Sequence, residues 1–259
     1  MRQPVAAIAA VGAAGLGCSE IWYKFDRFGV VRPGGVQDEA VDSAQQRLRL
    51  RATGCAGGLV TIAGFDMNRS IPKKDILIQC GPYFVRTIRM KDASERWAGW
   101  LSDTEATHML NSPAVTLTQD DVVKYIKSFD QRSHLLLGVF ERSSSLHIGI
   151  TRLDIEYGSG IALLNILIGE KDYRHKGVAS TIAMPCIDYF FRNPNLNAIK
   201  ANVLARNSIV LHFMTAMGWK FDDASPQRVR SATDNSTLDV RSLILSREAW
   251  SAWRGQTSG

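Results

Sequence analysis

The stretch of sequence that decides the fold is Ile166–Ser180, which reads ILIGEKDYRHKGVAS. Apolar residues typical of a β-strand end at Gly169, a short charged turn follows, and a helical pattern runs from Ser180 to Phe191. A basic, glycine-containing turn between a strand and a helix directs several backbone N–H groups and the helix N-terminus toward one point in space. The stretch therefore predicts a binding site for a pyrophosphate group.

The residues of this turn have distinct expected roles. Gly177 lets the backbone approach a phosphate closely because it has no Cβ, and Ala179 keeps the start of the helix narrow. Basic side chains add positive charge around the turn. The residues predicted to bind the anion are Arg174, His175, Lys176, Gly177, Val178, Ala179 and Ser180. The alternative is a basic turn whose glycine serves geometry alone, since the sequence has neither the Walker pattern nor the G-x-G-x-x-G pattern of dinucleotide folds.

The composition sets limits on the class of protein. The chain has 259 residues, 45% of them hydrophobic and 22% charged, and a net charge of +6. The charge is compatible with an anionic partner, but the sequence has no run of five basic residues, so we expect no nucleic-acid-binding arm. The four cysteines form no C-x-x-C pair and have no histidine at metal-ligand spacing. We therefore expect no metal site, no disulfide framework and a reducing, cytoplasmic location.

The N-terminal region differs from the rest of the chain. The apolar run Val5–Leu16 is shorter than the roughly 20 residues that span a bilayer, so we expect no membrane partner. Secretion with a lipid on Cys18 is the alternative. Residues 1–66 have little periodicity and are predicted to be a loosely ordered extension, or sequence upstream of a mis-set start before Met67. A small layer that covers the domain is the other interpretation. Residues 67–259 then form a single domain.

Hydrophobic periodicity within that domain predicts alternating strands and helices. Strands are expected at 83–88, 135–141, 146–155, 161–168, 199–204, 219–221 and 239–245. Helices are expected at 92–101, 104–110, 118–129, 180–191, 207–217 and 248–253. This order predicts an α/β fold in which a mixed sheet carries helices on both faces.

Two motifs resemble the signatures of a known family. The spacing Arg174-x-x-Gly177-x-Ala179 resembles the acyl-CoA-binding signature of the GCN5-related N-acetyltransferases (GNAT). Asn207 opens a helix that closes at Gly218-Trp219, which resembles the second signature of that family.

Two further segments resemble one branch of the family. The opening YFVRTIRMKDASERWAGWLSD and the tail from Asp239, with Glu248-x-Trp250, resemble the ribosomal-protein N-terminal acetyltransferases. The four motifs occur in the expected order and cover roughly residues 83–253.

The resemblance implies the GNAT fold, a mixed, mostly antiparallel central sheet with helices on both faces, and acetyl-CoA as cosubstrate without a metal. It implies that the strand at 163–168 splays from the strand at 201–204. The backbone of Ile166 and Ile168 would then pair with the pantetheine amides, as an added strand does. Asn207 would hold the pantetheine arm through its amide, act as a helix N-cap, or do both.

The sequence departs from the family where protons move. Many members have a glutamate on the splayed strand, where this chain has Ala162-Leu-Leu-Asn165. Many have a tyrosine in the second helix, where this chain has Met214. A water held by Asn165 could take the proton of the amine, and Ser208 is the other candidate catalytic residue; His212 is a spare.

The predicted function is N-acetyl transfer from acetyl-CoA to an amine by direct attack in a ternary complex. The acceptor, a protein N-terminus or a small-molecule amine, cannot be read from the sequence. Four acidic residues that could attract a cationic amine are Asp103, Glu105, Asp222 and Asp223. The alternative is a non-catalytic acyl-CoA-binding module on the same fold. We expect a monomer or homodimer.

Overall fold

The computed structural model describes residues 73–222, 227–232, 234 and 236–257. The predicted extension, residues 1–66, and the apolar run within it lie outside the described residues. So does Cys18.

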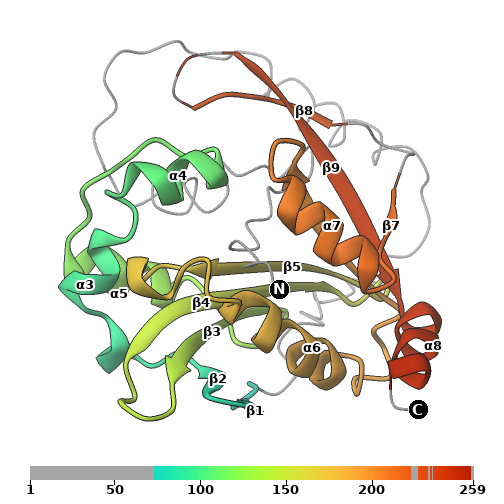
Figure 1. The fold of residues 1–259 in the computed structure, drawn as a ribbon. Helices are drawn as coiled ribbons and strands as arrows, with labels where there is room; N and C mark the ends of the chain where they lie inside the picture. The colour runs from blue at the N-terminus through green and yellow to red at the C-terminus, as the bar shows by residue number, and fades with distance from the viewer. Residues whose placement is uncertain (1–72, 223–226, 233, 235, 258–259) are drawn as a thin grey trace, which may run out of the picture.

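The centre of the molecule is a sheet in the order β1-β2-β3-β4-β5-β6-β9-β7, with β8 paired to β9 (Figure 1). Its strands are β1 (Leu77–Cys80), β2 (Tyr83–Thr87), β3 (His134–Glu141), β4 (His147–Glu156), β5 (Ile161–Ile168), β6 (Ala198–Leu204), β7 (Lys220–Phe221), β8 (Gln227–Arg230) and β9 (Thr237–Ser246). Among the described strands, β5 and β6 pair in parallel and the other neighbours pair antiparallel. The expected mixed, mostly antiparallel sheet is confirmed.

Helices cover both faces of this sheet. They are α3 (Glu95–Gly99), α4 (Thr104–Leu110), α5 (Gln119–Lys127), α6 (Val178–Phe190), α7 (Ser208–Ala216) and α8 (Arg247–Thr257), with short 3-10 turns at Met90–Asp92 and Lys171–Tyr173. Thr118 caps α5 in a capping box with Asp121, which satisfies two N–H groups at the helix start. In the described part of the chain, no helix combines the length and apolarity that a membrane span requires.

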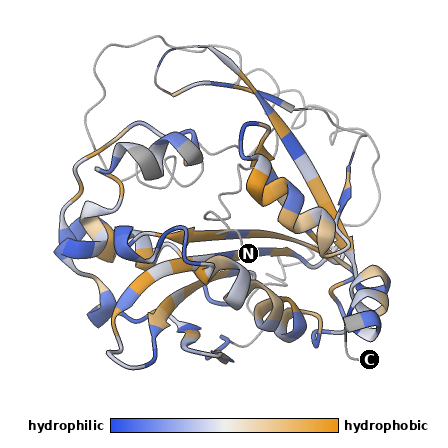
Figure 2. Ribbon diagram, viewed as in Figure 1, coloured by the Kyte–Doolittle hydropathy of each residue, from blue (hydrophilic) through white to orange (hydrophobic). Residues whose placement is uncertain are grey.

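Alternating burial along β5 assigns its side chains to two cores. Ala162, Leu164, Ile166 and Ile168 are buried in the larger core, beneath α6, α7 and α8. The opposite face of the sheet carries a second core with α3 and α5, against which Leu167 packs. Hydrophobic residues follow the strands and the sides of α6 and α7 that face them (Figure 2). This two-sided burial fixes the register of β5, because a slip of one residue would exchange its two faces.

Three elements differ from the sequence prediction. The sheet begins one strand earlier than expected, at β1, and β8 forms in a stretch expected to be a loop. The helix α6 begins at Val178 and continues through Pro185. The remaining predicted strands and helices are present within a few residues of their expected bounds.

Candidate functional site

β5 and β6 run side by side for only a short distance before they separate. Their paired residues are Ile161↔Ala198, Ala162↔Ile199 and Leu163↔Lys200. Beyond these, β5 continues along β4 to Ile168, and β6 continues along β9 to Leu204. A wedge therefore opens between the two strands, and its narrow end lies at Leu163 and Lys200. We call this opening the wedge.

The backbone direction along β5 decides which groups face the wedge. The carbonyl of Gly160 accepts hydrogen bonds from residues at the start of β6, whereas the N–H of Gly169 points to β4. Because direction alternates along a strand, the backbone groups of Ile166 and the N–H of Ile168 point into the wedge. The side chains of both isoleucines are 1% exposed and lie in the core. Their backbones alone are available to a ligand.

The glycine turn lies at the open end of the wedge, at the start of α6. Gly177 is the N-cap of α6 with φ +74°, and no side chain caps this helix end. His175 also has a positive φ, +58°. Two left-handed residues flank Lys176, a conformation that makes successive N–H groups converge. The hydroxyl of Ser180 donates to the Gly177 carbonyl at 2.7 Å, which holds the turn closed.

Arg174 is turned inward rather than toward this concavity. Its guanidinium donates to the carbonyls of Ile168 (3.3 Å) and Gly169 (2.6 Å) and pairs with Asp103 at 2.8 Å. The arginine side chain is 6% exposed. The expectation that Arg174 adds charge around the anion therefore needs correction, because its charge is neutralised where it ties the turn to the end of β5. His175 and Lys176 are exposed beside the turn.

The segment from Asp103 to Ser112, which contains α4, crosses between the parts of the chain that border the wedge. Asp103 holds Arg174, and the carbonyl of His108 accepts a hydrogen bond from Arg206. Asn111 bonds to the backbone of Arg230 and Ala232 next to β8, both at 2.9 Å. The segment is thereby fixed to the glycine turn, to the turn before α7 and to β8.

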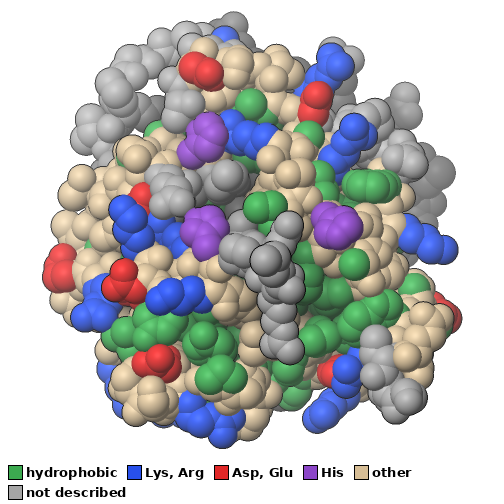
Figure 3. All heavy atoms as spheres, in the orientation of Figure 1, with side chains coloured by type: hydrophobic (Ala, Val, Ile, Leu, Met, Phe, Trp, Pro, Cys, Tyr) green, Lys and Arg blue, Asp and Glu red, His purple; other side chains and the backbone are tan. Residues whose placement is uncertain are grey.

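The start of α7 lies on the other side of the wedge. Asn207 is 4% exposed, and its side chain accepts a hydrogen bond from Val210 N at 3.4 Å. The predicted N-cap role is confirmed. Ser208 and His212 are exposed on α7, and Met214, in place of the family's tyrosine, is buried in the core. Lys, Arg and His side chains gather around the middle of the face that carries α4, α6 and α7 (Figure 3).

Asn165 lies on the face of β5 that is opposite to α6. It is half-buried, and its partner across the sheet on β4 is Arg152. Two of the acidic residues considered for the acceptor are engaged elsewhere: Asp103 holds Arg174, and Asp222 pairs with Lys200 at 2.8 Å. Asp223 and the side chain of Glu105 lie outside the described part of the structure. Within that part, no three metal-ligating side chains lie together.

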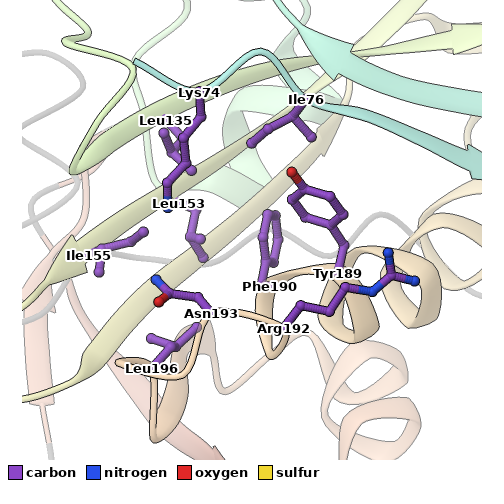
Figure 4. Close-up of a pocket in the computed structure, with 10 residues that line it drawn as sticks. All are labelled: Lys74, Ile76, Leu135, Leu153, Ile155, Tyr189, Phe190, Arg192, Asn193 and Leu196. Carbon is purple, nitrogen blue, oxygen red and sulfur yellow. The ribbon is translucent and has the colours of Figure 1, made fainter. Parts of the chain in front are cut away.

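A cavity of about 350 Å³ lies elsewhere, between the sheet and the C-terminal end of α6 (Figure 4). Its floor is apolar, formed by residues such as Leu135, Leu153 and Phe190, and Lys74 and Arg192 lie at its edge. It contains no residue of the glycine turn or of the wedge. The cavity is therefore separate from the candidate site.

The comparison with protein families gives one match. The sequence matches the model of the acetyltransferase (GNAT) domain over residues 85–229, more than half of the chain. A comparison with curated proteins found no match.

Solved structures share the fold at low sequence identity. Spermidine N-acetyltransferase from Vibrio cholerae, in complex with CoA and spermine, has a TM-score of 0.56 and 19% identity, covering 65% of this chain and 98% of that one. Ribosomal-protein-S5-alanine acetyltransferase from Vibrio fischeri has a TM-score of 0.57 and 14% identity, covering 68% and 99%. A GCN5-related N-acetyltransferase from Brucella melitensis has a TM-score of 0.58 and 12% identity, covering 71% and 85%. These likenesses show the fold alone, and it is the GNAT fold that the motifs implied.

Proposed function

Because this chain belongs to the GNAT acetyltransferase family, we propose that it transfers an acetyl group from acetyl-CoA to a primary amine by direct attack in a ternary complex. The observation that carries the proposal is the wedge with the left-handed Gly177 turn at its open end. The turn suits the pyrophosphate, since its N–H groups and the helix N-terminus favour an anion. The wedge offers the backbone of Ile166 and Ile168 to the pantetheine amides.

The reaction needs little from side chains. The nitrogen of the neutral amine attacks the thioester carbon, the new C–N bond forms, and the C–S bond breaks. A backbone N–H that faces the wedge stabilises the oxyanion. A water held by Asn165 takes the proton of the amine, and Ser208, in the first turn of α7, passes a proton from solvent water to the leaving thiolate. The products are the acetylated amine and free CoA.

A covalent route through cysteine has no support in the described residues. Cys186 is 0% exposed inside α6, where a hydrogen bond with Cys80 and burial raise its pKa well above the ordinary thiol value. Such a thiol is a poor nucleophile, because the thiolate is the reactive form. Direct attack is the simpler chemistry.

The proposal also covers the location of the enzyme, its oligomeric state and its branch of the family. We assign the enzyme to the cytoplasm, as a monomer or homodimer, and to the branch of ribosomal-protein N-terminal acetyltransferases on the strength of its opening and closing motifs. The acceptor is a protein N-terminus or a small amine.

The second candidate is a module that binds acyl-CoA without turnover. One observation favours it, which is that both usual proton-transfer groups are missing. Met214, 2% exposed, stands where many family members have the tyrosine that protonates the thiolate, and the strand carries Asn165 but no glutamate. Release of CoA thiol from acetyl-CoA, measured against a panel of amines, separates the two. Binding of acetyl-CoA without turnover on any amine would contradict the enzyme.

The variant Gly177→Val tests the pyrophosphate assignment. A β-branched residue at φ +74° strains the turn and places methyl groups where the anion would lie. We expect KM for acetyl-CoA to rise at least tenfold, about 1.4 kcal/mol. Gly158→Ala is the matched control, because a Cβ there meets nothing within 4 Å. An unchanged KM in Gly177→Val would remove the pyrophosphate from this turn.

A further inference from the structure

One buried side-chain amide near the wedge, that of Asn202, has only its oxygen hydrogen-bonded in the described structure. Asn202 on β6 is 2% exposed, and its Oδ1 accepts a hydrogen bond from Ser242 Oγ on β9 at 2.7 Å. Its Nδ2 is buried and has no hydrogen-bond partner in the described structure. Leaving a buried donor unsatisfied is costly, so such groups are uncommon and need an explanation. A ligand oxygen would supply one.

The register of the strands places Asn202 at the mouth of the wedge. The last pair between β5 and β6 is Leu163↔Lys200, and two residues further along each strand stand Asn165 and Asn202. Neighbouring strands lie about 4.8 Å apart where they pair. Two residues later the strands no longer pair. The two asparagines therefore oppose each other where the strands separate.

Both asparagines lie on the face of the sheet that is opposite to the glycine turn. The neighbours of Asn202 along β6, Ala201 and Val203, are buried in the core beneath α6 and α7, as Leu164 and Ile166 are on β5. Alternation then directs Asn165 and Asn202 to the other face. A CoA molecule whose pyrophosphate is bound at α6 enters the wedge from the α6 side. The acceptor amine reaches the thioester from the face of the two asparagines.

The direction of the Asn202 side chain is fixed by its partner. Since Oδ1 is turned toward β9, the Nδ2 of the same carboxamide is directed away from β9, and the strand on the other side of β6 is β5. Charged side chains on this face are paired with each other: Lys200 Nζ lies 2.8 Å from Asp222, and Arg152 on β4 pairs with Asp154. Asn202 thus presents a neutral donor, which suits an uncharged oxygen and cannot accept from a second ammonium group.

We propose that Asn202 is a specificity-determining residue, whose Nδ2 donates a hydrogen bond to a carbonyl or hydroxyl oxygen next to the reacting amine of the acceptor. The inference rests on the proposed acetyl transfer. It predicts that amines with such an oxygen are preferred over plain alkylamines, because a site with a buried donor rejects a substrate that leaves it unpaired.

L-alaninamide and isopropylamine test this preference, since they share the amine-bearing carbon and differ in the carbonyl. Release of CoA thiol is measured for each, with rates expressed per concentration of neutral amine. The unaltered protein should have a kcat/KM at least tenfold higher for alaninamide. Asn202→Asp keeps the shape and the acceptor for Ser242 but removes the donor. It should lower kcat/KM for alaninamide at least tenfold and for isopropylamine less than threefold.

Asn202→Leu, which also lacks the donor, should give the same pattern if the aspartate is poorly tolerated. Ser242→Thr, which keeps the hydroxyl that orients Nδ2, is the matched control and should retain the preference. The affinity for acetyl-CoA, measured by calorimetry, should be unchanged in all variants. Equal losses with both amines, or a preference that survives both Asn202 variants, would overturn the inference while leaving the transferase intact. Absence of turnover with every amine, with acetyl-CoA still bound, would overturn the proposed function and this inference together.

Discussion

A histidine among aromatic rings makes stability depend on pH. The ring of His147 stacks on Phe140 with centroids 4.8 Å apart and meets Trp97 and Trp100 edge-on at 5.0 Å. Burial disfavours the imidazolium and lowers the pKa of His147 to about 4 from its ordinary 6.5, although the nearby negative charge of Asp92 acts in the opposite direction. The unfolded chain therefore binds a proton at this residue at a higher pH than the folded chain does.

This difference predicts the sign of the pH effect. The contribution of the neutral His147 to the free energy of unfolding is fully present above pH 6.5. It is lost as the pH falls toward 4, since only the unfolded state gains the proton in that window. Between pH 7 and pH 5, we expect the free energy of unfolding to fall by about 2 kcal/mol less in His147→Phe than in the unaltered protein. Urea unfolding at both pH values measures it. His212→Asn, on the exposed face of α7, is the control. An undiminished acid sensitivity in His147→Phe would contradict the assignment.

Among single residues, the sequence predicts those whose role is local. The N-cap role of Asn207 and the glycine turn between a strand and a helix follow from residues that are close in the chain, and both occur as expected. The inward turn of Arg174 depends on Asp103, which is 71 positions away. The buried Nδ2 of Asn202, which has no hydrogen-bond partner in the described structure, lies where two strands stop pairing. Neither the contact of Arg174 with Asp103 nor the end of strand pairing beside Asn202 can be predicted from residues that are close in the sequence.

At the scale of elements, the segment from Asp103 to Ser112 supports the glycine turn. The buried guanidinium of Arg174 holds the end of β5 by two carbonyls, and Asp103 balances its charge. Removing one partner of a largely buried ion pair leaves the other charge uncompensated. The geometry of the turn therefore depends on a residue that lies 71 positions away from Arg174 in the chain.

Asp103→Asn tests this dependence with little change in shape. We expect a loss of about 2 kcal/mol in the free energy of unfolding and a rise of about threefold to tenfold in KM for acetyl-CoA, with kcat less affected. Thermal unfolding and initial rates measure the two effects. Asp239→Asn is the control, because its pair with Arg228 is exposed (63% and 77%) and such pairs contribute little. Equal behaviour of the two variants would show that Asp103 does not support the turn.

The elements that the sequence does not predict are short edge strands. In β1 the burial alternates, but the exposed Leu77 (59%) is apolar, so the sequence lacks the alternation of polar and apolar residues that marks a strand. In β8, QRVR contains one apolar residue, and the strand forms because β9 extends far enough to pair with it. The long strands β3, β4 and β5 are buried and were recognisable from their apolar runs.

At the scale of the whole molecule, the two faces of the sheet separate the two substrates of the proposed reaction. The glycine turn and α6 belong to the face of the larger core, and Asn165 and Asn202 belong to the other. The wedge is the place where the sheet is open between these faces. In the proposed reaction, this single break in strand pairing serves both as the groove for acetyl-CoA and as the route of the amine to the thioester.

The domain boundary can be tested on the same scale. In the described structure the core begins at Ile76, and Lys74 N donates to Gln131 O just before it. A chain that starts at Met67 keeps both, so we expect its Tm within 2 °C of the full chain, about 1 kcal/mol or less, and an unchanged KM for acetyl-CoA. A chain that starts at Gln79 loses Ile76 and Ile78, which are 2% and 6% exposed. Their burial contributes about 3–6 kcal/mol, so its Tm should fall by about 10 °C or more. A similar fall in the chain that starts at Met67 would mean that residues 1–66 cover the domain.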